Sequence, residues 1–264
     1  MDGLDGKYVA LKDWLSAHAP LALAFSGGVD SSFLLAACRE ADADHLAITV
    51  DSVFQSETER EDAFALAHGD RWLRISVDVL GIEGVCENPP ERCYLCKREI
   101  FKSIFERAEG RCVIDGTNYD DLGDFRPGMR ALRELGVKSP LMELGWRKAD
   151  IREMSRRLGL STADKPAMAC LATRIPMGER IEPGKLRAVD MAENAIKKLG
   201  FAQVRVRAHG DIARIELDRD MLVRAAEQAA DIVAAVKGAG FKRAALDLDG
   251  YNMGSMNERS VSGR

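Results

Sequence analysis

The sequence predicts an α/β fold, a doubly wound parallel sheet with a smaller α+β domain at the C-terminal end. In the first half, short apolar runs alternate with amphipathic stretches, the pattern of a parallel sheet covered by helices on both faces. After about residue 160 this alternation gives way to a turn-rich stretch and a separate group of elements. With 264 residues, 46% of them hydrophobic, the chain can bury one large core or two modest ones.

Apolar spacing gives the elements of the first half. In chain order they are an opening helix on Leu4, Tyr8, Leu11 and Leu15, a strand at 21–25, a helix at 30–40, a strand at 46–50, a helix from 56, a strand at 72–77, a helix at 92–108 and a strand at 112–115. Ligands of such sheets bind beyond the carboxyl ends of the strands. We therefore look for the chemistry at that edge.

The second half is divided from the first by a turn-rich stretch at 161–178, which contains Pro166 and Pro176. Beyond it the pattern predicts a helix at 183–199, a hairpin at 203–218, a helix at 220–237 and a strand at 243–248. We therefore place the first domain at 1–165 and the second at 166–254. The polar tail at 255–264 is expected to be disordered.

The composition excludes several classes of protein. Apolar content is too high, and the net charge of −4 too low, for a disordered chain. Lys and Arg (38) do not exceed Asp and Glu (42), which disfavours a nucleic-acid partner bound through a basic field. The N-terminus lacks the features of a signal peptide, and no apolar run approaches the ~20 residues that span a bilayer. We expect a cytoplasmic protein with no membrane partner.

The heptapeptide SGGVDSS, Ser26–Ser32, lies between a predicted strand and a predicted helix. Glycines let the backbone approach an anion closely, and a helix N-terminus offers free N–H groups and the positive end of the helix dipole. Ser26, Ser31 and Ser32 add hydroxyl donors. The motif is not a Walker A loop, because no Lys follows the glycines. An ordinary strand–helix turn is the alternative, and the complete heptapeptide after the first strand favours a phosphate site.

Two further segments lie at the same predicted edge. TVDS (49–52) ends the second strand, and DGTN (115–118) ends a later strand before a run that holds Asp120, Asp121 and Asp124. Alone, the second segment would be interpreted as an acidic, Asx-rich turn. Beside the phosphate loop, Asp51, Gly116 and Thr117 become candidates for nucleotide binding.

The six cysteines are too few for a disulfide scaffold in a chain of this length. Cys93 and Cys96 stand at i and i+3 at the start of a helix, so both sulfurs share one helix face. The helix N-terminus and the neighbouring basic residues favour thiolates. Three interpretations are open: a redox dithiol, half of a zinc site, or ligands of a cluster. A structural zinc needs four N or S ligands, and the four histidines are too dispersed to supply the missing ones.

The other cysteines fall into two groups. Cys170 lies in a proline-bounded loop beside Arg174, which argues mildly against plain core packing. Cys38, Cys86 and Cys112 are expected to be small buried residues, the usual fate of a lone cysteine.

Arg205 and Arg207 alternate with apolar residues on the first strand of the hairpin, so both side chains lie on one face of it. Two guanidiniums about 7 Å apart repel unless they are hydrated or bridged by an anion. From spacing alone, a solvated face and an anion site are equally good interpretations.

SGGVDSS resembles the signature of the PP-loop ATP pyrophosphatases, which have an adenine nucleotide alpha hydrolase-like fold. The resemblance implies cleavage of ATP between the α and β phosphates with Mg²⁺, with Asp30 placed to assist metal and phosphate geometry. It also implies that ATP is bound by residues of the loop and of the neighbouring strand ends: Ser26, Gly27, Gly28, Asp30, Ser31, Ser32, Asp51, Gly116 and Thr117.

Four linked motifs, SGGVDSS, NPPERCYLCK, DGTNYDDLGDFRPG and KPAMACLATRIPMG, resemble the LarE family of ATP-dependent sulfur transferases of nickel-pincer nucleotide biosynthesis. The resemblance implies adenylation of pyridinium-3,5-biscarboxylic acid mononucleotide and conversion of its carboxylates to thiocarboxylates. Sulfur would come from a 4Fe-4S cluster held by Cys93, Cys96 and Cys170. The alternative is Cys170 as a sacrificial donor that becomes dehydroalanine.

The same resemblance implies a second site and an assembly. Arg205 and Arg207 would contact the substrate phosphate, with Glu193 lining that site as a further catalytic residue, and the protein would be a homo-oligomer. The rival hypotheses are another PP-loop enzyme, such as a tRNA thiolase or an amide-forming synthetase, and a nucleotide-binding module without turnover. Pyrophosphate release in the presence of the mononucleotide separates the last from any enzyme.

Overall fold

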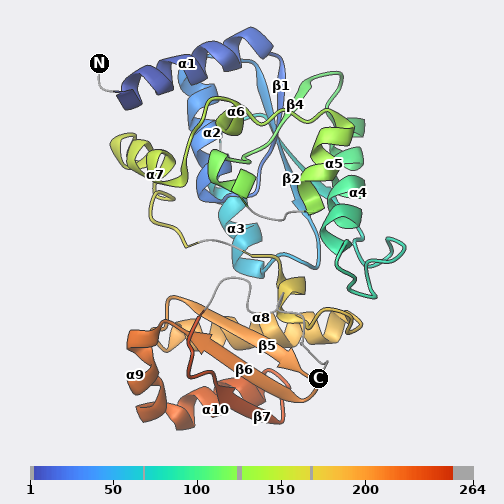
Figure 1. The fold of residues 1–264 in the computed structure, drawn as a ribbon, viewed down its shortest axis with the longest axis vertical. Coiled ribbons are helices and arrows are strands. Elements are labelled where there is room, and N and C mark those ends of the chain that lie inside the picture. The colour runs from blue at the N-terminus through green and yellow to red at the C-terminus, as the bar shows by residue number, and fades with distance from the viewer. Residues whose placement is uncertain (1–2, 68, 124–126, 167–168, 252–264) are drawn as a thin grey trace. The chain divides into compact units, whose positions relative to one another are not determined.

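A computed structural model describes residues 3–67, 69–123, 127–166 and 169–251 (Figure 1). The expected tail at 255–264 and Asp124 lie outside the described residues. The chain forms two compact units: the first comprises Met1–Ile82 and Glu91–Met168, the second Glu83–Pro90 and Ala169–Arg264.

The first unit is built on a four-stranded parallel sheet in the order β3-β2-β1-β4. Its strands are β1 (Leu21–Ala24), β2 (His45–Asp51), β3 (Trp72–Ser76) and β4 (Cys112–Ile114). All of them lie where the apolar runs predict strands. The predicted α/β fold with a parallel sheet is confirmed.

Helices cover both faces of this sheet (Figure 1). They are α1 (Gly3–His18), α2 (Val29–Glu40), α3 (Glu57–Leu66), α4 (Arg92–Arg107), α5 (Pro127–Leu135), α6 (Pro140–Glu143) and α7 (Lys148–Arg157), with a 3-10 turn η1 at Tyr119–Gly123. Leu21 and Leu23 pack with α1, α2 and α7, whereas Ala22 packs with α4 and α5. This alternation along β1 separates the two cores.

The second unit has a three-stranded mixed sheet in the order β5-β6-β7. Its elements are η2 (Leu171–Arg174), α8 (Pro183–Lys198), β5 (Val204–His209), β6 (Ile212–Leu217), η3 (Arg219–Met221), α9 (Leu222–Glu227), α10 (Ala229–Gly238) and β7 (Arg243–Leu246). The predicted small α+β arrangement is confirmed. The helix expected at 220–237 is instead broken at Gln228, whose φ of −96° and ψ of 21° end α9 before α10 starts.

The segment Glu83–Pro90 leaves the first unit and packs within the second. Asn88 is 1% exposed, and its side-chain amide donates to the carbonyls of Ile175 and Pro176 at 3.2 and 2.7 Å. Backbone bonds add Gly178 N to Asn88 O at 2.9 Å and Ile181 N to Cys86 O at 2.7 Å. The segment is therefore a structural part of the second unit, although the sequence pattern assigns it to the first domain.

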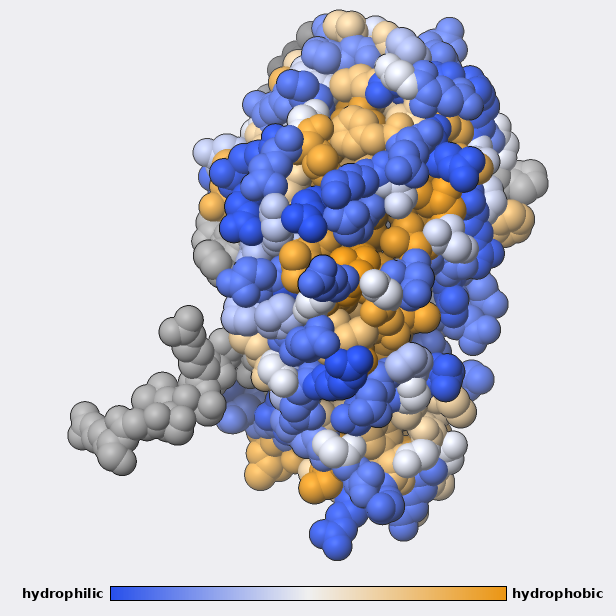
Figure 2. Space-filling model, turned by 90° about the vertical axis from the view of Figure 1, so that its right-hand side faces the viewer, coloured by the Kyte–Doolittle hydropathy of each residue, from blue (hydrophilic) through white to orange (hydrophobic). Residues whose placement is uncertain are grey.

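The surface carries many charged and polar side chains. Figure 2 shows one face of the molecule, on which hydrophilic side chains are spread widely and hydrophobic ones are visible between them. None of the helices within the described residues has both the length and the apolar character needed to cross a membrane.

One buried carboxylate makes stability depend on pH. The Asp70 side chain is 6% exposed and accepts bonds from Arg39 Nε at 3.0 Å and His45 Nε2 at 3.1 Å. Burial raises its pKa, but the bonds to Arg39 and His45 outweigh burial and hold the pKa below its usual value. A lowered pKa adds stability that is present above the unfolded value of about 3.9 and is lost as pH falls through the folded value.

We therefore expect Asp70→Asn to lower the free energy of unfolding by about 1–3 kcal/mol at pH 7. The difference from the unmutated protein should shrink as pH falls below about 4. Urea denaturation followed between pH 3 and pH 8 measures it. Asp164→Asn is the control, since the Asp164 side chain is 75% exposed in its pair with Arg156. A difference that stays constant across this pH range would contradict the prediction.

Candidate functional site

The heptapeptide Ser26–Ser32, called the phosphate loop after its predicted ligand, links the end of β1 to the start of α2, as the motif predicts. Ser31 Oγ lies 3.1 Å from Ser26 Oγ and donates to Gly28 O at 3.3 Å, so hydroxyls brace the loop from inside. Ser32 is 7% exposed, and its Oγ makes no hydrogen bond within the described residues. The loop therefore combines a fixed backbone with a hydroxyl that is available to a ligand.

Asp30 lies in the first turn of α2 and contacts a lysine that the sequence analysis did not single out. Lys148 Nζ, at the start of α7, lies 2.6 Å from Asp30 Oδ2. Oδ1 of the same carboxylate is buried and accepts no hydrogen bond from the described part of the chain. One oxygen is thus held by a cation while the other is suited to a metal ion or a protonated group.

A second lysine reaches the same loop. Lys165 Nζ donates to the Gly27 carbonyl at 3.1 Å and pairs with Asp62 at 2.7 Å. Lys148 and Lys165 bring two positive charges to a loop predicted to bind phosphate. Their contacts span 118 and 138 residues of sequence, so no local pattern identifies Lys148, whereas Lys165 at least lies within the KPAMAC motif.

Two glycines allow the close approaches that shape this loop. Gly27 has φ +71°, and a Cβ there would lie 2.9 Å from Ala63 Cα on α3. A Cβ on Gly116 would lie 3.1 Å from both Asp30 Cβ and Ser31 N. Gly116 therefore brings the end of β4 against the phosphate loop, as predicted for residues at one edge of the sheet.

We expect Gly27→Ala to lower stability by about 2–4 kcal/mol, from the positive φ and from the contact with Ala63. Nucleotide affinity should fall at least about tenfold, because the loop must shift. Gly110→Ala is the matched control, since Gly110 has φ +76° with nothing within 4 Å of its Cβ position. Urea denaturation and calorimetric titration with ATP measure the two effects. Equal losses of ATP affinity in both variants would contradict the prediction that the contact with Ala63 causes the loss.

Thr117 and Asp51 have side-chain partners of their own. Asp115 is buried, and its carboxylate accepts bonds from the hydroxyls of Ser139 at 2.6 Å and Thr117 at 2.5 Å. Asp51, at the end of β2, pairs with Arg74 and with Arg60 at 3.3 Å. Both carboxylates therefore brace the strand ends from which a nucleotide would be held.

The cysteines differ in environment. Cys93 is exposed and Cys96 half-buried, both near the N-terminus of α4, and Arg92 Nη2 lies 3.8 Å from Cys93 Sγ. Burial raises the pKa of Cys38 to about 12 and raises that of Cys112, so neither is a ready thiolate. Cys38 is buried as expected, whereas Cys86 and Cys112 are half-buried, so the expectation of buried residues is wrong for these two.

The third candidate cysteine belongs to the second unit, whereas Cys93 and Cys96 belong to the first. Cys170 is exposed and directly precedes η2. Within the ranges that the structure describes, no group of three or more His, Cys, Asp or Glu side chains is placed to hold a metal ion.

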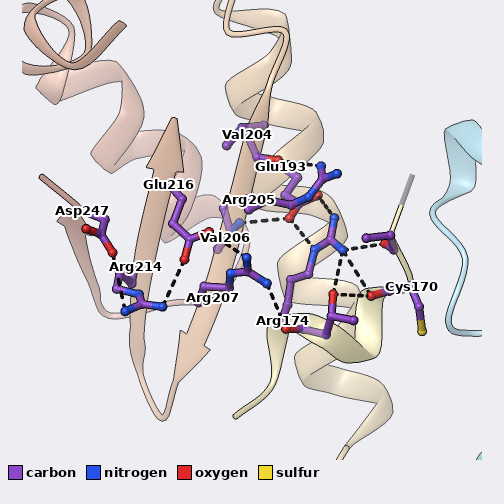
Figure 3. Close-up of polar contacts among 12 residues, drawn as sticks. Cys170, Arg174, Glu193, Val204, Arg205, Val206, Arg207, Arg214, Glu216 and Asp247 are labelled. Atoms are coloured by element: carbon purple, nitrogen blue, oxygen red, sulfur yellow. Dashed lines mark hydrogen bonds and ion pairs between the residues drawn. The ribbon is translucent and has the colours of Figure 1, made fainter. Parts of the chain in front are cut away.

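The second unit holds a cluster of buried arginines and carboxylates beside β5 (Figure 3). Arg205 and Arg207 are 6% and 5% exposed, so they do not form the solvated strand face that was one of the two interpretations. Arg205 Nη1 donates to Val204 O at 3.1 Å, and burial, with the nearby charge of Arg174, lowers its pKa. Arg207 Nη2 lies 2.7 Å from Glu216 Oε2.

Glu193, on α8, is 3% exposed and connects this cluster to Cys170. Its carboxylate pairs with Arg174 in two parallel bonds, Nε to Oε1 at 2.9 Å and Nη2 to Oε2 at 3.0 Å. Oε1 also accepts Val206 N at 2.9 Å, on the free edge of β5. Four members of the cluster were not assigned to a site by the sequence analysis, although the first of them lies in the CLATR motif: Arg174, Arg214, Glu216 and Asp247.

Comparison with known proteins gives full-length relatives. The chain is 36% identical to an uncharacterised protein of Synechocystis over 265 residues, covering 96% of this chain and 98% of that protein. It is 32% identical to the pyridinium-3,5-bisthiocarboxylic acid mononucleotide synthase of Lactiplantibacillus plantarum over 252 residues, covering 90% and 89%. An uncharacterised protein of Methanocaldococcus jannaschii is 31% identical over 251 residues, covering 93% and 97%. No family model matches the chain.

Proposed function

The chain belongs to the LarE family of ATP-dependent enzymes, and from this premise we propose that it inserts sulfur into pyridinium-3,5-biscarboxylic acid mononucleotide. A substrate carboxylate would attack the α-phosphorus of ATP, and the α–β bridging bond would break to release pyrophosphate. A sulfur nucleophile would then attack the acyl carbon, with AMP as leaving group. The observation that carries the proposal is the phosphate loop, with Asp30, Lys148 and Lys165 gathered at it.

The loop residues have distinct roles in this proposal. Asp30 Oδ1 is a hard oxygen ligand suited to Mg²⁺, while Lys148 and Lys165 supply charge for the phosphates. The turn and the N-terminus of α2 would bind the phosphates of ATP through Ser26, Gly27, Gly28, Ser31 and Ser32. Asp51, Gly116 and Thr117 would hold the nucleoside from the strand ends.

For the sulfur, we propose that Cys93, Cys96 and Cys170 hold a 4Fe-4S cluster. Two features support it: Cys93 and Cys96 lie at i and i+3 near the N-terminus of α4, and thiolates are the ligands that such clusters take. With three cysteine ligands for four irons, such a cluster would have one iron without a protein thiolate, and it would supply a binding site for an additional sulfide. Cys170 as a sacrificial donor is the alternative, supported by the exposure of that residue.

The decisive experiment uses protein purified without oxygen. Incubation with ATP, Mg²⁺ and the biscarboxylic mononucleotide should release pyrophosphate and give product in which sulfur replaces oxygen, read by mass spectrometry. Iron and acid-labile sulfide near four each per chain would support the cluster. Iron-free protein that loses the mass of one H₂S in a turnover would support the sacrificial route. Sulfur appearing in added tRNA, with none in the mononucleotide, would overturn the proposal in favour of a tRNA thiolase.

We place the substrate phosphate at Arg205 and Arg207. Their cluster carries four arginines, Arg174, Arg205, Arg207 and Arg214, against three carboxylates, Glu193, Glu216 and Asp247, among the residues drawn in Figure 3. The buried members are Arg174, Arg205 and Arg207 against Glu193 and Glu216. An excess of positive charge among these described residues favours an anionic group.

Arg207→Ala should therefore weaken binding of the mononucleotide at least about tenfold and leave ATP affinity unchanged, because the phosphate loop lies in the other unit. Calorimetric titration with each ligand measures this, and the exposed Arg243 on β7 provides the control variant Arg243→Ala. An equal loss of both affinities would contradict the two-site arrangement. The homo-oligomer that we also propose is tested by light scattering of the same samples.

A further inference from the structure

Three donors hold the main-chain carbonyl of Cys170. Cys170 O accepts Thr173 N at 2.9 Å, Thr173 Oγ1 at 2.7 Å and Arg174 Nη1 at 3.1 Å. The same Nη1 donates to Ala169 O at 2.5 Å. The two peptide carbonyls at and before Cys170 are therefore fixed by one guanidinium and by the first turn of η2.

That guanidinium is fixed in turn by the sheet. Arg174 is 3% exposed, and its other two nitrogens form the parallel pair with Glu193. Glu193 is bound to the free edge of β5 through Val206 N. A continuous chain of bonds thus runs from β5 through Glu193 and Arg174 to Cys170, and Figure 3 shows the sulfur at the far end of it, turned away from the arginines.

A second path joins the cysteine to the arginine cluster. Arg207 Nη1 donates to Thr173 O at 3.0 Å, while Thr173 itself holds the Cys170 carbonyl through its N–H and hydroxyl. The strand that carries Arg205 and Arg207 is thereby coupled to the residue that would carry sulfur. Arginine suits this position because its planar fork makes two parallel bonds to a carboxylate and donates to two carbonyls at once, whereas a lysine ammonium has only three N–H donors.

We propose that Arg174, anchored by Glu193, is a positioning residue that fixes the main chain at Cys170 and so the direction of its thiol. The consequence for sulfur transfer rests on the proposed function, whereas the consequence for order at Cys170 does not. Reactive groups must be held close to their productive geometry, and a misplacement of about 1 Å can cost about a hundredfold in rate. On this view Glu193 acts through Arg174 rather than on the substrate.

The test compares Arg174→Lys and Glu193→Gln with the matched control Arg180→Lys. Arg180 is an arginine of the same unit whose pair with Glu87 is solvent-exposed, at 64% and 59%. Three quantities are measured on the full chain: hydrogen exchange of the peptide containing the Thr173 amide, alkylation of Cys170 by iodoacetamide read by mass spectrometry, and kcat and KM for sulfur transfer. Thermal unfolding and pyrophosphate release report whether each variant is folded.

In both test variants we expect the Thr173 amide to exchange at least about tenfold faster, because its acceptor is no longer fixed. Cys170 should be alkylated at an unchanged or higher rate, whereas kcat for sulfur transfer falls about 10- to 100-fold with KM little changed. Arg180→Lys should match the unmutated protein. A lost catalytic group would leave exchange at Thr173 unchanged, and general unfolding would also lower the melting temperature and pyrophosphate release, so faster exchange with slower transfer in a folded variant identifies positioning.

Two outcomes would overturn the proposal. Exchange at Thr173 and sulfur transfer that both stay within about twofold of the unmutated protein would show that Arg174 does not order Cys170. Loss of pyrophosphate release together with sulfur transfer, at a lowered melting temperature, would reduce Arg174 to a general structural role. If the unmutated protein transfers no sulfur at all, the proposed function fails, and the exchange measurement still decides whether Arg174 orders Cys170.

Discussion

Cys170→Ala should abolish thiocarboxylate formation, lowering its rate by roughly three orders of magnitude or more, while pyrophosphate release continues. The reason is that the two proposed steps use different residues: the phosphate loop of the first unit serves adenylation, and Cys170 of the second unit serves sulfur transfer. Adenylation needs the loop and both substrates, whereas the sulfur step needs the thiol. Mass spectrometry of the product and a coupled pyrophosphate assay measure the two steps separately.

Two variants complete this experiment. Cys86→Ala is the matched control, because Cys86 is a half-buried cysteine of the same unit outside the proposed site. Cys93→Ala separates the sulfur sources: it should remove iron and transfer together if a cluster is used, and leave a single turnover intact if Cys170 is sacrificed. A Cys170→Ala protein that still makes thiocarboxylate would contradict both sulfur routes.

Glu216→Gln should be the most destabilising single substitution considered, lowering the free energy of unfolding by about 3–5 kcal/mol. Glu216 is 0% exposed and pairs with Arg207 at 2.7 Å and Arg214 at 3.1 Å. Arg207 and Arg214 stand directly opposite each other in the β5–β6 register. Like charges in that position repel, and the carboxylate of Glu216, two residues beyond Arg214 on the same face, bridges them.

Gln keeps the size of the side chain and removes its charge, so the loss isolates the electrostatic part. Glu87→Gln is the control, since its pair with Arg180 is solvent-exposed and should be worth about 0–1 kcal/mol. Urea denaturation of both variants at pH 7 gives the comparison. A loss below about 1 kcal/mol for Glu216→Gln would mean that the two guanidiniums find another partner.

Most elements of the first unit were predictable because they follow local spacing. β1 and the middle of β2 are short apolar runs buried on both faces, and α1 buries Tyr8, Leu11 and Leu15 at helical intervals. The break between α9 and α10 was not predictable, because residues 222–238 contain no proline and only a terminal glycine. The burial of Arg205 and Arg207 was not predicted for a different reason. The sequence of β5 alternates as that of a half-exposed strand does, but η2 and α8 pack against the strand.

The candidate site divides in the same way. The phosphate loop was predictable because its chemistry is local, with glycines, hydroxyls and Asp30 in one heptapeptide. Lys148 and Lys165 could not be assigned, since only the folded sheet brings residues 118 and 138 positions away to that loop. The link from Glu193 to Cys170 likewise depends on α8, η2 and β5 together.

Because Glu83–Pro90 belongs to the second unit, this segment is synthesised long before the residues that it contacts there. Asn88 leaves the ribosome 88 residues before Pro176, whose carbonyl its amide will bind. β4, which pairs with β1, is therefore synthesised before the residues that this segment binds. A chain that ends at residue 165 would contain Glu83–Pro90 but lack the carbonyls of Ile175 and Pro176 that Asn88 binds. A single cut in the chain therefore cannot separate the two units intact. The chain passes between the two units three times, so expressing one unit alone requires one new junction: Ile82 to Glu91 for the first, or Pro90 to Ala169 for the second.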